Sequence, residues 1–421
     1  MKISRFASRF DMNSGIVQLM DDLGSAMSEN KDMLMMGGGN PSHIPEIQSF
    51  FHDKMQRVLD RPAEFAHMIG DYDSPQGDKP FLEAVAELLN EENGWDISSK
   101  NIALTAGSQA GFFLLFNIFA GECTDGVNRQ ILLPMAPEYI GYSDVGLSDD
   151  MFIARKPDIE TFDDHTFKYY VNFDELNIDQ KSDNNIGAIC VSRPTNPTGN
   201  VITDSEVKHL SKLAEENDIP FIIDNAYGMP FPNIIFSEAT SFWNDNTILC
   251  MSLSKIGLPG VRTGIIIANE EIISTVARMN AVLNLSVGSV GPTLAHDLVT
   301  SGEISRLSRT IIKPYYQKKS ELAQELFHHE LAGLDYYIHK SEGAIFLWLW
   351  FPGLPISSEV LYQRLKQRGV LIISGHHFFP GLESDWQHKH ECIRVTYSMD
   401  KNIIQEGIKI IADEVKKAYR P

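Results

Sequence analysis

Short apolar runs alternate with amphipathic stretches through the middle of the chain. Runs of four to eight apolar residues are typical of buried strands, and apolar residues that recur every three or four positions predict helices. The expected strands are 101–105, 130–134, 151–154, 186–191, 221–223, 247–251 and 264–268, and the clearest helices are 47–59, 79–89, 106–120 and 204–217. This alternation predicts an α/β fold around a mostly parallel sheet.

The C-terminal part follows another pattern. A helical stretch near 303–326 contains Pro314, which is expected to kink it or to mark a boundary. Short strands with one helix between them then predict a smaller α+β domain. The strands are 342–350, 369–374 and 391–397, and the helix is 357–368.

A further helix is expected at 15–28, in an N-terminal arm. The resulting division is 1–50 for the arm and part of the small domain, 51–310 for the large domain, and 311–421 for the C-terminal small domain.

Length and charge narrow the classes of function. With 421 residues, the chain is too long for one simple core, so two or three domains are expected. A net charge of −20 disfavours nucleic acid and anionic lipid as partners. No apolar run is long enough for a transmembrane helix, and the first residues lack the apolar core of a signal peptide.

The cysteines and histidines indicate neither disulfides nor a metal site. The cysteines are widely spaced, and three stand in apolar runs, as in a reduced cytoplasmic protein. They are Cys123, Cys190, Cys250 and Cys392. The pairs His376–His377 and His388/His390 are expected in surface loops, and no metal ligand spacing is found. The polar stretch 143–185 is expected to contain one strand, 151–154, and no motif.

Lys255 stands between two expected strands. Ser252 and Ser254 precede it, and Arg262 follows in a turn rich in glycine and proline. Burial lowers a lysine's pKa, which suits an amine that bonds covalently to a carbonyl carbon. The hydroxyls and the arginine could bind a phosphate. The alternative is a surface turn in which the lysine only extends into solvent. The sequence of this turn alone does not decide between a site lysine and a surface lysine.

Other polar residues follow strands at their carboxyl ends, where open parallel sheets bind ligands. Gly107 and Ser108 open a helix whose free N–H groups could bind an anion, although such turns also occur without ligands. Asp224 follows strand 221–223, where an aspartate is more often a capping residue than a catalytic one. Arg394 stands in an apolar strand and therefore needs an anionic partner.

Four loops carry further candidates. The stretch 37–41 is rich in glycine and is either a close approach to a ligand or a hinge. Two prolines and a glycine hold Asn196 in place, and Tyr139 could lie over a planar ring. Tyr72, in a turn-rich loop, could be only a packing residue.

Five motifs occur in one order along the chain. They are Asn196-Pro-Thr-Gly, Asp224-x-x-Tyr227, Ser-x-Ser-Lys255, Pro-Gly-x-Arg262 and Ile-Arg394. With these motifs the chain resembles the fold-type I, class I/II pyridoxal-phosphate-dependent aminotransferases over nearly its whole length. The resemblance implies a large domain with a mostly parallel seven-stranded sheet between helices, and a smaller α+β domain.

The resemblance also implies a role for each site residue. Lys255 would hold pyridoxal 5'-phosphate covalently and move a proton, Asp224 would pair with the pyridine nitrogen, and Tyr227 would donate to the phenolic oxygen. The implied cofactor-binding residues are Gly107, Ser108, Gln109, Tyr139, Asn196, Asp224, Tyr227, Ser252, Ser254, Lys255, Arg262 and, across a homodimer, Tyr72. The implied substrate-binding residues are Gly39, Asn196 and Arg394.

The implied reaction is a ping-pong transfer of an amino group between L-valine and pyruvate, which gives 3-methyl-2-oxobutanoate and L-alanine. One alternative is another neutral amino-acid aminotransferase of this fold, and a second is a C–S lyase that uses the same lysine. A third is a non-catalytic regulator with a DNA-binding domain, which the short arm and the acidic charge argue against. The apolar stretches 33–36 and 377–379 either line a side-chain pocket or pack in the core.

Overall fold

The computed structural model describes residues 2–4, 7–9, 20, 24, 33–176, 178 and 185–420. Its larger sheet has the strand order β2-β11-β10-β9-β8-β4-β3, and β5 also pairs with β4. These strands are β2 Ile102–Ala106, β3 Gly121–Glu122, β4 Asn128–Leu133, β5 Phe152–Ala154, β8 Ile186–Ser192, β9 Phe221–Asp224, β10 Thr247–Ser252 and β11 Thr263–Ile267. All seven expected strands are present, and the short β3 is an eighth strand that the sequence pattern did not predict.

Most neighbours in this sheet are parallel. The pairs β9–β10, β8–β9, β4–β8 and β4–β5 run parallel, whereas β11 is antiparallel to β10 and β2, and β3 to β4. Every residue of β8, β10 and β11 is buried, as in a sheet that is covered on both faces. The expected α/β fold is confirmed.

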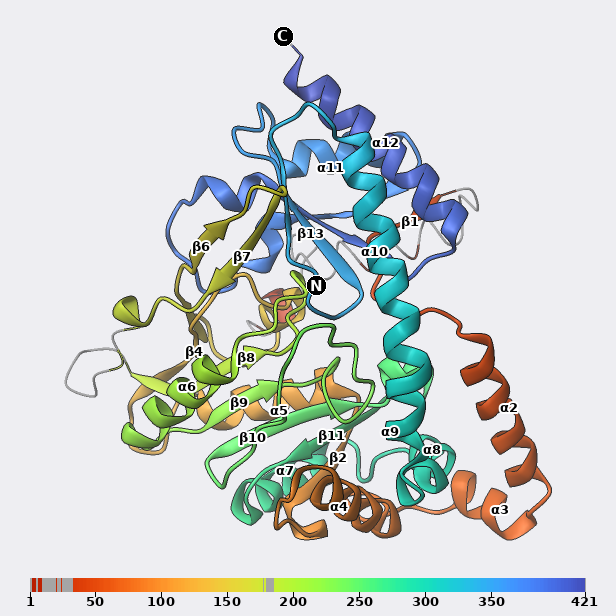
Figure 1. The fold of residues 1–421 in the computed structure, drawn as a ribbon. Helices are drawn as coiled ribbons and strands as arrows, with labels where there is room; N and C mark the ends of the chain where they lie inside the picture. The colour runs from red at the N-terminus through yellow and green to blue at the C-terminus, as the bar shows by residue number, and fades with distance from the viewer. Residues whose placement is uncertain are drawn as a thin grey trace.

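Helices connect and cover these strands (Figure 1). They are α4 Lys79–Asn93, α5 Ser108–Phe119, α6 Asp204–Glu216, α7 Glu270–Leu283 and α8 Val290–Thr300. Helix α5 contacts β2, β4, β10 and β11, and α6 contacts β8 and β9. Thr203 caps α6, since its hydroxyl accepts from the Glu206 amide and its own amide donates to the Glu206 carboxylate.

A second sheet has the order β15-β16-β13-β12-β7-β6. Its strands are β6 Asp158–Thr161, β7 Thr166–Tyr170, β12 Tyr337–His339, β13 Phe346–Trp350, β15 Ile373–Ser374 and β16 Cys392–Thr396. The pair β1 Leu34–Met35 and β14 Val370–Leu371 lies nearby, as do α11 Ser358–Gln367 and α12 Lys401–Tyr419.

Strands β6 and β7 correct the expectation of a single strand in 143–185. Strand β6 lies at the sheet edge and is polar, so it lacks an apolar run. Strand β7 is mostly buried but includes Lys168, whose ammonium pairs with Glu342. The division into 1–50, 51–310 and 311–421 stays a prediction. Strand β7 pairs with β12 of the C-terminal segment, and β6 pairs with β7.

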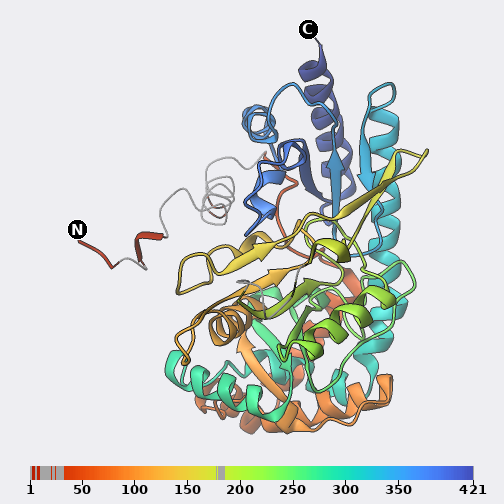
Figure 2. The same cartoon turned by 90° about the vertical axis from the view of Figure 1, so that its left-hand side faces the viewer.

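A long helical stretch connects the two parts of the fold. It consists of α9 Glu303–Leu307, a π-helical turn Ser308–Ile312 and α10 Lys313–Glu330. Pro314 falls at the start of α10, so the wider turn just before it accommodates the missing N–H. Helix α10 runs from beside α9 to the smaller sheet, where it packs against α12 (Figures 1 and 2).

The remaining expectations have mixed outcomes. The helix expected at 15–28 lies almost wholly outside the described residues. The cysteines are free, and Cys190, Cys250 and Cys392 are buried. His388, expected at the surface, is instead buried between Trp350 and Trp386. Of the helices in the described part of the chain, none is long and apolar enough to cross a membrane.

Candidate active site

Parallel strands β8, β9 and β10 bring their carboxyl ends to one edge of the larger sheet. Ser192 at the end of β8 pairs in register with Asp224, and Asp224 pairs with Cys250 of β10. The loops that follow these strands therefore meet at this edge. Most of the site residues expected from the sequence lie on or beside them.

Lys255 lies in a short 3-10 turn, Ser254–Ile256, directly after β10. Its Nζ donates to the carbonyl oxygen of Gly39 at 2.6 Å and lies 5.4 Å from the centre of the Tyr227 ring. Desolvation, aided by the positive charges of Arg394 and Arg262, lowers the pKa of Lys255 to about 8. A large fraction of the amine is therefore neutral near pH 8 and can act as a nucleophile or a base.

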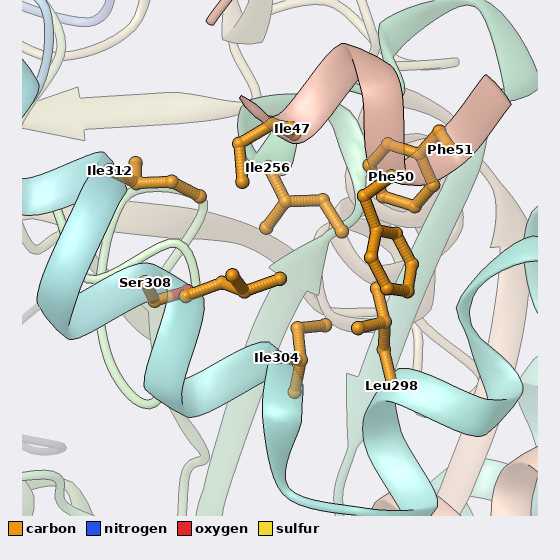
Figure 3. A pocket seen from close by; sticks show the side chains of 9 residues that line it. Ile47, Phe50, Phe51, Ile256, Leu298, Ile304, Ser308 and Ile312 are labelled. Carbon is orange, nitrogen blue, oxygen red and sulfur yellow. The ribbon is translucent and has the colours of Figure 1, made fainter. Parts of the chain in front are cut away.

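The residue after Lys255 anchors this turn. Ile256 is buried, and its side chain enters an apolar cavity between α2 Pro45–Leu59, α8 and α9 (Figure 3). Ile47 and Phe51 of α2 and Leu298 of α8 contribute to the cavity wall. Packing on one side of the turn therefore fixes the position from which Lys255 extends on the other.

Five residues form what we call the donor cup. They are Gly107, Ser108, Ser252, Ser254 and Arg262. Strands β2 and β11 are antiparallel, with Ala106 opposite Thr263, so the end of β2 lies beside Arg262. A Cβ on Gly107 would lie 2.1 Å from Nη2 of Arg262, so only glycine permits this approach.

Two further features supply donors to the cup. Helix α5 begins at Ser108 without a side-chain cap, so its first amides are available to an anion. The hydroxyls of Ser252 and Ser254 lie 2.9 Å apart. The cup therefore combines a guanidinium, hydroxyl groups and backbone amides, the donor types that bind a phosphate.

Asp224 is buried at the end of β9. Its Oδ2 accepts a hydrogen bond from the Tyr142 hydroxyl at 2.8 Å, and its Oδ1 accepts from the Ala226 amide at 3.0 Å. Burial raises the pKa of Asp224 to about 6, although these two hydrogen bonds oppose the rise. At neutral pH the carboxylate is therefore charged and stabilised by few groups, so it would gain from a cationic partner.

Tyr139 and Gln109 lie beside Tyr142. The Tyr139 and Tyr142 rings are edge to face with centres 5.4 Å apart. The Gln109 side chain donates to the Gly141 carbonyl at 2.8 Å, and its Oε1 is buried without a hydrogen-bond partner. The side chain of Gln109 therefore supports the loop that carries Tyr139.

Gly37, Asn196 and Arg394 form what we call the Arg394 cluster. Nη1 of Arg394 donates to Oδ1 of Asn196 at 2.7 Å, and Nη2 donates to the Gly37 carbonyl at 2.7 Å. The guanidinium lies 4.1 Å from the centre of the Phe346 ring and 5.0 Å from that of Phe378. Arg394 is 2 % exposed, and its Nε lacks a hydrogen-bond partner.

The Arg394 cluster lacks an anion within the residues described. Desolvation lowers the pKa of Arg394 to about 10, so the guanidinium is charged at neutral pH. Both recorded acceptors are neutral, and one buried N–H is unused. A bound carboxylate would supply the missing charge.

Tyr72 and Gly39 complete the set of residues expected at the site. Tyr72 is 81 % exposed in the loop before α4, away from the burial that the other site residues share. Gly39, expected to bind substrate, lies beside Lys255, and its carbonyl accepts from the Lys255 amine.

Sequence reasoning missed several residues here. Tyr142 contacts Asp224, and Phe346 and Phe378 flank Arg394. Glu138 is buried, accepts from the Ser192 amide at 2.9 Å, and has its pKa raised to about 8 by burial. A signal existed for Tyr142, since it follows Tyr139 by one turn in a loop already singled out. Phe378 lies in the apolar stretch 377–379, which the sequence indicated as a possible pocket wall, but nothing in the sequence indicated a role for Phe346 or Glu138.

A family model for class I and II aminotransferases matches residues 33–411. The chain belongs to this aminotransferase family. It is 48% identical over 419 residues to a valine–pyruvate aminotransferase of Escherichia coli, and the alignment covers 100% of this chain and 99% of that protein.

Two solved structures agree with this membership. A putative amino-acid aminotransferase from Psychrobacter arcticum has a TM-score of 0.96 and 48% identity, covering 100% of this chain and 99% of that one. A valine–pyruvate aminotransferase from Salmonella typhimurium has a TM-score of 0.88 and 48% identity, covering 96% of this chain and 100% of that one. The aminotransferase resemblance seen in the sequence motifs is confirmed.

Proposed function

We propose that this aminotransferase transfers the amino group between L-valine and pyruvate, with pyridoxal phosphate as its cofactor. The observation that carries the substrate assignment is the 48% identity, over the whole chain, to the relative named for that pair. The enzyme takes the amino group from valine in one half-reaction and gives it to pyruvate in the next, so 3-methyl-2-oxobutanoate and alanine are the products.

The residues at the sheet edge fit pyridoxal phosphate. The donor cup offers a phosphate its guanidinium, hydroxyls and helix amides, and Gly107 leaves room for close approach. The poorly compensated carboxylate of Asp224 would pair with the pyridine nitrogen, and Tyr139, Asn196 and Tyr227 would hold the ring. Pyridoxal phosphate, when bound, supplies an electron sink for the charge that develops at the substrate Cα.

Arg394 would bind the carboxylate that every amino acid and 2-oxo acid shares. Its unpartnered Nε and the second N–H of each Nη remain as donors while Asn196 and Gly37 fix the plane of the guanidinium. The substrate carboxylate would relieve the cost of a buried, uncompensated cation. This contact would set the position of the substrate Cα relative to Lys255.

Lys255 would hold the cofactor and move the proton that leaves the substrate Cα. Its pKa of about 8 keeps a usable fraction of the amine neutral near neutral pH, as a general base requires. The Gly39 carbonyl, which accepts from Nζ at 2.6 Å, would hold the amine between transfers.

Apolar rings beside Arg394 suit a small neutral side chain. Phe346 and Phe378 flank the guanidinium, and both rings are fully buried. Two arginines, Arg394 and Arg262, act electrostatically on Lys255. Arg394 would bind the substrate α-carboxylate and Arg262 the phosphate, so neither would be left for a second carboxylate on the substrate side chain. This arrangement favours valine and alanine over aspartate.

A donor panel tests the substrate assignment. Purified enzyme with pyruvate should use valine at least about ten-fold faster, by kcat/KM, than aspartate or phenylalanine. A clear preference for aspartate or phenylalanine would overturn the assignment while leaving transamination in place. Pyruvate release from cystathionine without any amino acceptor would instead favour the C–S lyase alternative.

We also propose that the enzyme is a homodimer in which Tyr72 of the partner subunit reaches the phosphate. Exposed apolar residues support a second copy as the partner, namely Tyr72, Val282 and Leu285, at 81 %, 84 % and 64 % exposure. The loop that carries Tyr72 contacts the end of α7, near Val282 and Leu285, because Asn280 of α7 donates to the Pro75 carbonyl at 3.1 Å. A cytoplasmic location is proposed as well, supported by the buried free thiols.

Subunit mixing tests the role of Tyr72. Lys255→Ala and Tyr72→Ala chains are each expected to be nearly inactive, but a mixed dimer would contain one intact site. Random exchange should therefore restore about a quarter of wild-type activity. No recovery after verified exchange would contradict the proposed contact.

A further inference from the structure

Glu359, His376 and His377 lie together outside the site described above. Glu359 is in the first turn of α11, and the two histidines are in the 3-10 turn Gly375–Phe378 that follows β15. One nitrogen or carboxylate oxygen from each of the three lies within 4.8 Å of the others. All three side chains are half-buried, so the two histidines are less exposed than the surface position expected from the sequence.

One oxygen of the Glu359 carboxylate accepts a hydrogen bond, and the other has no hydrogen-bond partner. Its Oε1 accepts from Nε2 of Gln363 at 2.9 Å. Its Oε2 is buried without a hydrogen-bond partner and lies 4.0 Å from Nε2 of His377. An oxygen in this state is available as a ligand at the cost of a small movement.

A hydroxyl pair orients the His376 ring. Nδ1 of His376 lies 2.8 Å from the Ser374 hydroxyl, which in turn lies 2.8 Å from the Ser358 hydroxyl. When Nδ1–H donates to Ser374 and Ser374 donates to Ser358, the lone pair of Nε2 is free. A second residue that fixes the ring through its other nitrogen is the usual support of a metal-binding histidine.

Both histidines also line a cavity of about 180 Å³, together with Ser143, Asp144 and Phe379. A space of this size holds several water molecules. It would allow water to complete the coordination of an ion bound to the three side chains.

We propose that Glu359, His376 and His377 bind a divalent transition-metal ion, and that Zn²⁺ matches the site best. Two imidazoles and one carboxylate form a typical zinc ligand set with a position left for water, whereas Mg²⁺ and Ca²⁺ prefer oxygen ligands alone. The ligands come from a helix and a turn far apart in the sequence, so residue spacing did not reveal them.

The bound ion would join α11 to the turn that ends in Phe378. Since Phe378 flanks Arg394, the ion would hold one wall of the Arg394 cluster without touching the substrate. The ion is therefore expected to stabilise the fold. No step of the transamination requires it.

Zinc titration of the untagged, purified enzyme, with no amino acid present, tests this proposal. Calorimetry with Zn²⁺ alone should show one site per chain, and Zn²⁺ should raise the Tm. Glu359→Gln and His377→Gln should each weaken binding by at least about ten-fold, and Ser374→Ala, which leaves the ligands in place, should also weaken it. The matched control is His329→Gln, an exposed histidine that also neighbours a glutamate.

The proposal fails if the wild type binds Zn²⁺ no more tightly than Glu359→Gln and His377→Gln do, or if His329→Gln weakens binding equally. The Tm of each variant without metal shows whether it is folded. Should a ligand variant not fold, the comparison of Ser374→Ala with the wild type decides, and unchanged affinity there would overturn the proposal.

Discussion

The donor cup and the Arg394 cluster are two ends of one site, and they are built in different ways. The cup is formed at one edge of the larger sheet, by residues that flank β2, β10 and β11 in direct register. In the Arg394 cluster, Arg394 of β16 in the smaller sheet contacts two residues that are distant in the sequence. Asn196, in the loop after β8, is 198 positions away, and Gly37, in the loop before α2, is 357 positions away. One end therefore belongs to a single sheet, whereas the other depends on the docking of two.

This difference separates the part of the site that would stay occupied through the whole cycle from the part that would be refilled in each half-reaction. A cup on one sheet can hold the cofactor in the same place throughout the cycle. The Arg394 cluster would receive a new carboxylate in each half-reaction, and between them its cation would have only the neutral partners seen in the structure. Variants at the two ends should therefore alter different kinetic constants.

The largest effect is expected at Lys255. Lys255→Ala should lower kcat on the order of ten-thousand-fold for every amino acid, because it removes both the covalent attachment and the base. The intact cup should still bind pyridoxal phosphate without a covalent bond, as equilibrium dialysis would show. Lys79→Ala, at an exposed lysine, is the matched control. Full activity of Lys255→Ala would remove this lysine from the mechanism.

An intermediate effect is expected at Arg394. Arg394→Lys keeps the charge but loses the planar fork, so KM for alanine and for valine should both rise about ten- to a hundred-fold. Cofactor affinity and the ratio between the two substrates should hardly change. If valine kinetics collapse while alanine kinetics survive, Arg394 shapes the side-chain pocket instead.

A smaller effect is expected at Tyr142. Its hydroxyl favours the charged form of Asp224, so Tyr142→Phe should raise the pKa of that carboxyl above about 6. Asp224 is neutral below its pKa, so the pH below which cofactor affinity falls should move upward, by up to about one unit. Cofactor titration between pH 5 and pH 8 measures this shift. An unchanged profile would show that Tyr142 does not tune Asp224.

Most of the cup could be predicted from the sequence because its residues flank strands that are adjacent in the chain. Ser252, Ser254 and Arg262 stand between two apolar runs that form an antiparallel pair, β10 and β11. Local pattern and sheet geometry together placed them at one edge. The aminotransferase motifs then predicted that these residues bind the cofactor.

The Arg394 cluster could be predicted only in part. The sequence indicated that a buried arginine needs an anionic partner, and the structure pairs it with an amide and a carbonyl. The packing of Phe346 and Phe378 on its two sides depends on how β13 and the turn after β15 meet β16, which no local pattern encodes. Strand β6 was missed for a related reason, because an edge strand is defined by its neighbour and not by an apolar run.

The fate of the amino nitrogen tests the proposed reaction most directly. Purified enzyme would be given pyruvate and L-valine that carries a heavy-nitrogen label, and the products would be followed by NMR and mass spectrometry. We predict that the label appears in alanine, and that 3-methyl-2-oxobutanoate forms in equal amount. Label released as ammonium, or label that stays in valine while alanine gains nitrogen from another donor, would contradict it.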